Sequence, residues 1–285
     1  MRITTGSLAV ACIVLGAWSR APAQAAKKKE DADVKQPTER ESRILELFTA
    51  TKKNFTKDGR IQLVYAFETR QQDLVADWSP ALDAKNMRIR WSRPGEATYS
   101  TLDYGIMIGD YGEWMHDATF LADNLDVTVD QSNAAAFKPG TISAAVLFNE
   151  KKKLSLGVNA GAQAVVLKGF RAAKPPIPRA ERPVLSNQRY KAGYRIKGSV
   201  IECILNGSKL SDTSENVKFT EGFDRGRVGL AWSGSVQSYI HQVIIKGNLD
   251  PEWVAKALGE ADPSKADKKK AKTVKKAEPK TAAPK

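Results

Sequence analysis

The stretch from Asp103 to Asp117 gathers acidic and aromatic side chains more densely than any other part of the chain. Cleavage of a glycosidic bond usually requires two carboxyl groups about 5–9 Å apart. We therefore select Asp110 and Glu113 as candidate catalytic residues. Four further side chains in this stretch could bind a ligand: Tyr111, Trp114, His116 and Asp117.

These residue types suit the recognition of sugars. Exposed aromatic rings can stack on sugar rings, and carboxylates can accept hydrogen bonds from sugar hydroxyls. The alternative is a turn-rich loop in which the rings pack inward and the acids face water. Gly105, Gly109 and Gly112 are compatible with either arrangement, because glycine imposes little backbone preference.

The chain offers few ligands for a metal ion. Its only two histidines, His116 and His241, have no second histidine or cysteine at metal-ligand spacing. The acidic series Asp123, Asp126 and Asp130 lacks the alternating ligands and central glycine of a calcium loop, so we predict solvated loop acids. We predict no metal and no cofactor, and we expect His241 to point outward from the last strand.

The N-terminus is typical of a secretory signal peptide. Arg2 gives a positive start, residues 8–18 form an apolar run, and small residues at Ala23 and Ala25 suit cleavage after Ala25. The apolar run is much shorter than the roughly 20 residues that span a bilayer. We therefore predict a secreted, periplasmic or cell-surface protein that does not span a membrane, with a non-cleaved anchor as the alternative.

The net charge of +13 comes mainly from the two ends of the chain. Residues 265–285 contain nine lysines against Asp267 and Glu278, which leaves +7, while Arg2 and Arg20 contribute +2, so the rest of the chain carries +4. A tail rich in Lys, Ala and Pro cannot bury enough apolar surface to fold. It could contact anionic polymers of the cell envelope. We predict no specific nucleic-acid partner, because no reading motif is recognisable.

A short helix is predicted near each end of the domain. Thr38 and Glu41 have the spacing of a capping box, and apolar residues then recur at helical spacing. This pattern predicts an amphipathic helix over residues 39–53. Asp250 followed by Pro251 predicts the start of a final short helix.

Between these helices the sequence has the pattern of short strands separated by turns. The Asn206-Gly207 pair is a strong hairpin signal, because both residues tolerate positive φ. Many short strands without long alternating helices indicate an all-β sandwich or jelly roll. The predicted strands cover residues 62–69, 87–91, 105–108, 125–129, 142–148, 153–158, 164–167, 190–196, 200–205, 226–232 and 240–246.

The last third of the chain resembles the C-terminal half of concanavalin A-like lectin/glucanase domains. Three segments carry this resemblance in order: YRIKGSVIECILNGSKLSD, GFDRGRVGLAW and YIHQVIIKGNLDPEW. They are most similar to the secreted bacterial branch named 3-keto-disaccharide hydrolase, also described as a domain of unknown function. The matching features are the Asn206-Gly207 hairpin, the glycine-flanked strand from Gly226 to Leu230, and a closing strand around Gln242.

The resemblance implies a concanavalin A-like jelly-roll sandwich of two antiparallel sheets, and it also implies glycoside hydrolase activity. It is good over residues 189–253 and plausible from Asp58 to Leu167. The paired-carboxylate strand of the glucanase relatives, Glu-x-Asp-x-x-Glu or a near variant, is absent from the sequence. The resemblance therefore predicts the fold, while the identity of a catalytic pair rests on Asp110 and Glu113.

Together these observations predict four segments: a signal peptide over 1–25, a charged linker over 26–37, the jelly-roll domain over 38–258 and a disordered tail over 259–285. Our first functional hypothesis is an exported glycan-binding or envelope-associated module, whose partner is a carbohydrate or cell-envelope polysaccharide. The second is a glycoside hydrolase of the 3-keto-disaccharide hydrolase type. The third is a structural cell-surface protein held by its basic tail.

Overall fold

The computed structural model describes residues 33–69, 71–80, 90–92, 105–108, 112–133, 140–149, 152–159, 164–168, 189–198, 200–209, 224–234 and 238–261. Almost all of these residues belong to one unit that begins at Lys35. The predicted signal peptide, most of the predicted linker and the lysine-rich tail beyond Ala261 lie outside the described residues. Asp110 and Tyr111 lie outside them as well.

Strands make up most of the described chain. The helices are α2 (Glu39–Glu46) and α3 (Pro251–Leu258), with two 3₁₀ turns, η1 (Phe67–Thr69) and η2 (Gln72–Val75). In the described part of the chain, neither helix has the length and apolar character needed to cross a bilayer. The strands are β1 (Val34–Lys35), β2 (Lys52–Thr56), β3 (Ile61–Ala66), β4 (Trp78–Pro80), β5 (Arg90–Ser92), β6 (Gly105–Ile108), β7 (Gly112–Leu121), β8 (Asp126–Asn133), β9 (Gly140–Asn149), β10 (Lys152–Asn159), β11 (Ala164–Lys168), β12 (Arg189–Lys197), β13 (Val200–Leu205), β14 (Ser208–Lys209), β15 (Arg225–Gly234) and β16 (Ser238–Gly247).

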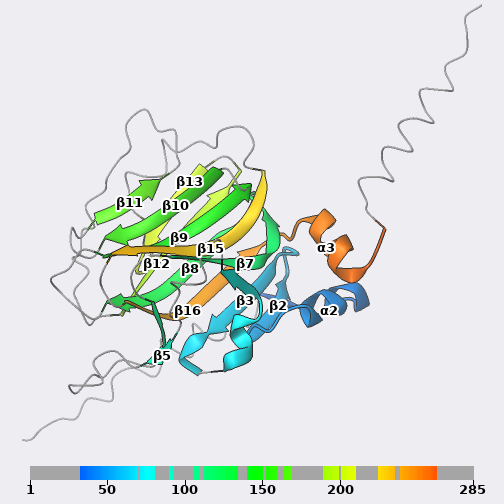
Figure 1. Ribbon diagram of the computed structural model, residues 1–285. Helices are drawn as coiled ribbons and strands as arrows, with labels where there is room; N and C mark the ends of the chain where they lie inside the picture. Colours follow the sequence, from blue (N-terminus) through cyan, green and yellow to red (C-terminus); the bar gives the residue numbers. More distant parts are fainter. Residues whose placement is uncertain are drawn as a thin grey trace, which may run out of the picture. The chain divides into compact units, whose positions relative to one another are not determined.

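The strands form two sheets (Figure 1). In the larger one, sheet A, the strands after β1 run in the order β2-β3-β16-β8-β12-β13-β14, and β6 pairs with both β16 and β5. The smaller one, sheet B, runs in the order β11-β10-β9-β15-β7-β4. Neighbouring strands in both sheets are antiparallel. The prediction of an all-β sandwich of two antiparallel sheets with a short helix near each end is confirmed.

One hydrophobic core lies between the facing sides of the two sheets. Sheet A contributes Val127 and Val129 from β8, and sheet B contributes Trp114 and Phe120 from β7. Successive side chains of a strand point to opposite faces of the sheet. The residues of β8 that flank these valines therefore lie on the other face of sheet A: Asp126, Thr128 and Asp130.

Helix α2 starts as predicted and ends earlier than predicted. The Thr38 side chain accepts a hydrogen bond from the Glu41 N–H at 3.3 Å, and the Glu41 carboxylate accepts one from the Thr38 N–H at 2.8 Å. The predicted extension to residue 53 was wrong, because the chain leaves the helix and places Phe48 in the core, only 3% exposed. Phe48 stacks on Trp253 of α3 with ring centroids 5.8 Å apart, so burial of one aromatic ring overrides helix propensity.

The end of the chain follows the sequence pattern closely. Asn206 and Gly207 have φ values of 49° and 81° and connect β13 to β14, which confirms the predicted hairpin. Asp250 caps α3 by accepting a hydrogen bond from the Glu252 N–H at 3.2 Å. Gly259 ends the helix with φ at 68°. Each of these signals acts through the local backbone, which explains why they could be recognised without the tertiary structure.

Strand β7 was not predicted. Its inward positions, Trp114, His116, Ala118 and Phe120, are all buried, but the alternation is broken by Met115, which is apolar and also buried. Strand β7 also contains glycine, glutamate and aspartate, which are depleted in strands. The strand forms because these inward side chains fill the core between the two sheets.

The prediction that His241 points outward was wrong. Its side chain is 0% exposed, and its Nε2 lies 2.8 Å from the Ser132 hydroxyl. The register of β16 against β8 shifts between Ile240 and Gln242. His241 is therefore the extra residue of a β-bulge, which interrupts the alternation of inward and outward side chains along β16. Gly105 makes room for the imidazole, because an added Cβ there would lie 2.9 Å from His241 Nδ1.

Replacing Gly207 by alanine should lower the free energy of unfolding by about 1–2 kcal/mol, since residues with a Cβ are strained at left-handed φ. The cost should be conformational only, because an added Cβ meets nothing within 4 Å. Urea unfolding measures the effect. Asn206→Gly is the matched control and should lose no stability; an equal loss in both variants would contradict the assignment.

Candidate functional site

Strand β7 places the residues selected from the sequence in different environments. Trp114 and His116 are 1% and 0% exposed, respectively. Glu113 is partly buried, whereas Asp117 is exposed. The structure thus brings His116 and Trp114 together inside the core and leaves Asp117 at the surface. A ligand-binding or catalytic role for the six selected residues stays a prediction.

Trp114 belongs to an aromatic cluster between the sheets. Its ring stacks on Trp78 of β4 with centroids 4.7 Å apart, and Phe67 lies 5.5 Å away. Trp78 in turn contacts His116 edge to face at 5.1 Å. Ring faces covered in this way stabilise the core, and a sugar could reach Trp114 only if the cluster opened.

Tyr65 connects His116 to Asp77 inside this cluster. The Tyr65 hydroxyl lies 2.7 Å from His116 Nε2 and donates to Asp77 Oδ2 at 2.5 Å. Asp77 Oδ2 also accepts a hydrogen bond from the Thr49 N–H at 2.7 Å. Nδ1 of His116 accepts one from the Ala118 N–H at 3.0 Å. The three side chains are at most 8% exposed, so a continuous chain of hydrogen bonds lies within the apolar core.

The hydrogen-bond partners of Tyr65, His116 and Asp77 determine which atoms carry the protons. Because the Ala118 N–H donates to Nδ1, the imidazole of His116 carries its own proton on Nε2 and donates to the Tyr65 oxygen. Tyr65 has a single hydroxyl proton, which is directed at the Asp77 carboxylate. The arrangement satisfies a neutral histidine and an ionised aspartate with no proton left over.

Burial sets the titration of all three groups. Desolvation, with a smaller contribution from the charge of Arg227, lowers the pKa of His116 to about 3. Desolvation raises the pKa of Asp77, although hydrogen bonds from Tyr65 and Thr49 oppose it. Burial and the nearby Asp77 charge raise the pKa of Tyr65 well above its ordinary value. These protonation states suit a fixed structural element better than a proton relay.

Arg227 stabilises an irregularity in β7. The register of β7 against β15 shifts between Met115 and Thr119, which leaves carbonyl groups outside the regular ladder. Arg227 donates to the His116 carbonyl at 2.8 Å and to the Met115 carbonyl at 3.2 Å. It also donates to Asp117 Oδ1 at 2.9 Å. Asp117 therefore contributes to the anchoring of Arg227 on the bulged strand.

The face of sheet A that turns away from the core carries a row of polar side chains. Lys191 in β12, Asp130 in β8 and Gln242 in β16 are direct cross-strand neighbours. The prediction that Asp126 and Asp130 are solvated loop acids was wrong, because both lie in β8 and Asp130 is only 5% exposed. Residues directly opposite one another in adjacent strands share a face, so this row is continuous across three strands.

Arg189 links this row to the η1 turn. Its Nε and Nη2 donate to the two Asp130 oxygens at 2.9 and 3.0 Å, and Nη2 also donates to Glu68 Oε2 at 2.8 Å. Burial disfavours its charge, but hydrogen bonds and charges from Asp130 and Glu68 outweigh burial and raise the pKa of Arg189. We refer to Glu68, Asp130, Arg189, Lys191 and Gln242 as the Arg189 cluster.

The cluster combines fixed geometry with access to solvent. The side chains of Arg189 and Glu68 are 25% and 31% exposed, whereas that of Asp130 is 7% exposed. A nearly buried carboxylate thus holds the guanidinium of a side chain that is partly exposed. Such an arrangement offers hydrogen-bond donors and acceptors on side chains that are already held in place before a ligand binds.

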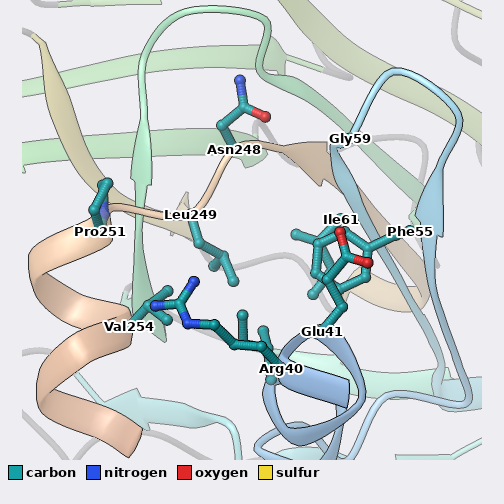
Figure 2. A pocket seen from close by; sticks show the side chains of 10 residues that line it. Arg40, Glu41, Phe55, Gly59, Ile61, Asn248, Leu249, Pro251 and Val254 are labelled. Atoms are coloured by element: carbon teal, nitrogen blue, oxygen red, sulfur yellow. The ribbon is translucent and has the colours of Figure 1, made fainter. Parts of the chain in front are cut away.

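A second candidate is a pocket of about 220 Å³ between α2, α3 and the β2–β3 hairpin (Figure 2). Arg40 and Glu41 of α2 line it, but Arg40 pairs with Glu260 at 2.8 Å and Glu41 pairs with Lys35 at 2.9 Å. Because both charged side chains of this pocket already have a partner outside it, we favour the Arg189 cluster. The apolar lining residues are Ile44, Phe55, Ile61, Leu249, Pro251 and Val254.

Sequence reasoning missed the Arg189 cluster. Its members come from η1, β8, β12 and β16, and the ion pairs join residues up to 121 positions apart. One signal was available, since Asp126, Thr128 and Asp130 alternate with two valines as in a half-buried strand. No group of three potential metal-ligating side chains occurs among the residues that the structure describes.

No protein-family model matches the sequence, and no curated protein matches it. Solved structures with a similar fold include carbohydrate-binding module CBM66 from Bacillus subtilis, which is 12% identical, with 61% of this chain and 93% of that chain covered and a TM-score of 0.35. A native glycosidic hydrolase is 12% identical, with 65% and 94% covered and a TM-score of 0.44. A protein of unknown function with a galectin-like fold, also from Bacillus subtilis, is 12% identical, with 63% and 94% covered and a TM-score of 0.39.

These similarities are similarities of fold. At 12% identity and TM-scores of 0.35–0.44, they assign neither a family nor a function to this chain. The narrower resemblance to the 3-keto-disaccharide hydrolase branch stays a prediction.

Stability should fall as the pH falls from 6.5 to about 3, because in this interval the unfolded chain protonates His116 and the folded chain does not. The contribution of His116 to the pH dependence of the unfolding free energy should approach about 1.4 kcal/mol per pH unit. Near the acid end, the raised pKa of Asp77 acts in the opposite direction and offsets part of this dependence. Urea unfolding at several pH values measures it. His116→Gln keeps a donor for Tyr65 and should flatten the dependence; an unchanged slope in the variant would refute the assignment.

Arg227→Met should destabilise the fold by about 1–3 kcal/mol, because it leaves the Met115 and His116 carbonyls without their charged donor. Thermal or urea unfolding measures the loss. Arg40→Met is the matched control, since solvent screens the exposed Arg40–Glu260 pair and its loss should cost much less stability. Similar losses of stability in both variants would mean that the bulge in β7 does not depend on Arg227.

Proposed function

We propose that this chain is a glycan-binding module that holds its ligand at the Arg189 cluster and does not cleave it. The observation that carries the proposal is the position of Arg189, fixed between Asp130 at 2.9 Å and Glu68 at 2.8 Å on the outer face of sheet A. Each sugar hydroxyl can both donate and accept a hydrogen bond. A surface that presents fixed donors beside fixed acceptors therefore suits a carbohydrate.

The fixed geometry of the cluster supports binding because it lowers the entropic cost. Ordering a long flexible side chain costs about 0.5–1.5 kcal/mol on binding. Arg189 is already held by two carboxylates, and Asp130 lies in a row with Lys191 and Gln242. A ligand that contacts this row gains hydrogen bonds without first ordering the guanidinium.

The state of the described carboxylates supports binding without catalysis. A glycosidase needs a general acid whose pKa is raised and which reaches the substrate. Asp77 has a raised pKa, but it is only 8% exposed and bonded to Tyr65 in the core. Asp117 reaches the surface, but it pairs with Arg227. Hydrolysis through Asp110 and Glu113 is the alternative proposal.

Export and attachment to the cell envelope are part of the proposal. The signal-peptide pattern of residues 1–25 would bring the module outside the cytoplasm, where polysaccharides are abundant. The charge of +7 on residues 265–285 would let the tail contact anionic envelope polymers without a defined binding geometry. Glycan recognition by the sheet and electrostatic contact by the tail would then act independently.

The chain should bind at least one polysaccharide of a panel in affinity electrophoresis or calorimetry, and it should release no reducing or keto sugar. Arg189→Ala should weaken binding at least about tenfold, as expected for a central arginine contact. Because this change leaves the buried Asp130 carboxylate with Lys191, 3.9 Å away, in place of its close arginine partner, Glu68→Gln provides a second, milder variant. Its side chain is 31% exposed, so it should fold and still weaken binding.

Arg40→Ala is the control, because Arg40 pairs with Glu260 on the helices and lies outside the cluster. It should bind like the unmodified chain. Failure of every polysaccharide to bind would overturn the proposal. Sugar release that disappears in Asp110→Asn or Glu113→Gln would instead favour the hydrolase.

A further inference from the structure

We infer that the Arg189 cluster selects uncharged glycans over polyanionic ones. This inference rests on the proposed function and adds the chemical class of the ligand. It follows from how the charges on the outer face of sheet A are paired, in contrast to the net charge of +13 for the whole chain, which alone would favour polyanions.

Within the cluster the formal charges cancel. Arg189 and Lys191 are the two cations, and Glu68 and Asp130 are the two carboxylates. Arg189 contacts both carboxylates, at 2.8 and 2.9 Å, and Lys191 lies 3.9 Å from Asp130 Oδ2. Gln242, the fifth member, is neutral and lies beside Asp130 in the next strand. The cluster therefore presents strong dipoles without an excess of positive charge.

The next polar row of sheet A repeats this pairing. Arg195 lies 3.0 Å from Asp126 and 3.9 Å from Glu202 of β13. Arg60, from the β2–β3 hairpin, lies 3.3 Å from Asp126 and 2.7 Å from Asp58. Both arginines share Asp126, which also lies opposite Lys246 of β16. The row thus sets three cations against three carboxylates and does not extend the cluster into a basic stripe.

Paired charges of this kind penalise an anionic ligand. A uronate or sulfate that approaches Arg189 must compete with Glu68 and Asp130, and it must also approach their negative charges. At about 4 Å, two like charges repel by about 4 kcal/mol at a dielectric constant near 20. A hydroxyl avoids this penalty, since it can donate to a carboxylate oxygen and accept from the guanidinium.

The lysine-rich segment 265–285 gives the chain a separate way to bind polyanions. Its excess of seven positive charges is well separated in the sequence from the residues of the Arg189 cluster. Binding through this segment should be electrostatic and therefore sensitive to salt. Binding at the cluster should depend on short hydrogen bonds and resist salt. The two binding modes, through the lysine-rich segment and at the Arg189 cluster, can thus be distinguished in the full chain by their response to salt.

The experiment measures binding of the full chain to two sets of polysaccharides at low salt and at about 1 M NaCl, where the Debye length is about 3 Å. The neutral set is cellulose, xylan, laminarin, galactan and levan, and the anionic set is polygalacturonate, alginate and heparin. We expect binding to a neutral glycan to persist in high salt within about twofold and to fall at least about tenfold in Arg189→Ala. Binding to the anionic set should be lost in high salt and should be unchanged in Arg189→Ala.

Glu68→Gln separates the possibilities further, because it removes one negative charge and keeps the shape of the side chain. Under our inference it weakens neutral binding and gives the cluster a salt-sensitive affinity for anionic glycans that Arg189→Ala abolishes. Preference of the unmodified chain for anionic glycans through Arg189 would overturn the inference and leave the proposed function standing. Absence of binding to either set would overturn both, and Arg40→Ala again provides the unaffected control.

Discussion

The alternation of side chains along β8 constrains the rest of the domain. Val127 and Val129 must enter the core between the sheets, and this places Asp126 and Asp130 on the opposite face of sheet A. A shift of one residue would bury the two carboxylates and expose the valines. The same periodicity therefore fixes the core and the polar face together, and Arg189 is positioned only because the carboxylates face outward.

The core accommodates the three polar side chains Tyr65, His116 and Asp77 because their hydrogen bonds are completed locally. Tyr65, His116 and Asp77 form a chain in which each donor meets an acceptor, and the Thr49 N–H supplies a further bond to the carboxylate. An unpaired polar group at the same depth would cost about 1–3 kcal/mol. The burial of His116 is thus explained by packing and by hydrogen bonding.

Charge location explains more about this protein than total charge does. Most of the net +13 lies in the terminal segments, including +7 in residues 265–285, whereas Arg189 and Arg195 on the outer face of sheet A are each paired with carboxylates. Overall basicity suggests an affinity for polyanions. The pairing on the sheet instead favours a ligand that donates and accepts hydrogen bonds equally.

The sequence by itself determined the all-β class, the Thr38 cap, the Asn206-Gly207 hairpin and the Asp250 helix start, because each depends on neighbouring residues or on a short period. It did not determine the burial of His241, since a bulge in β16 shifted the phase of the strand. It also missed the Arg189 cluster. Strands distant in the sequence must pair before these side chains meet, and cross-strand register is decided by tertiary packing and not by local propensity.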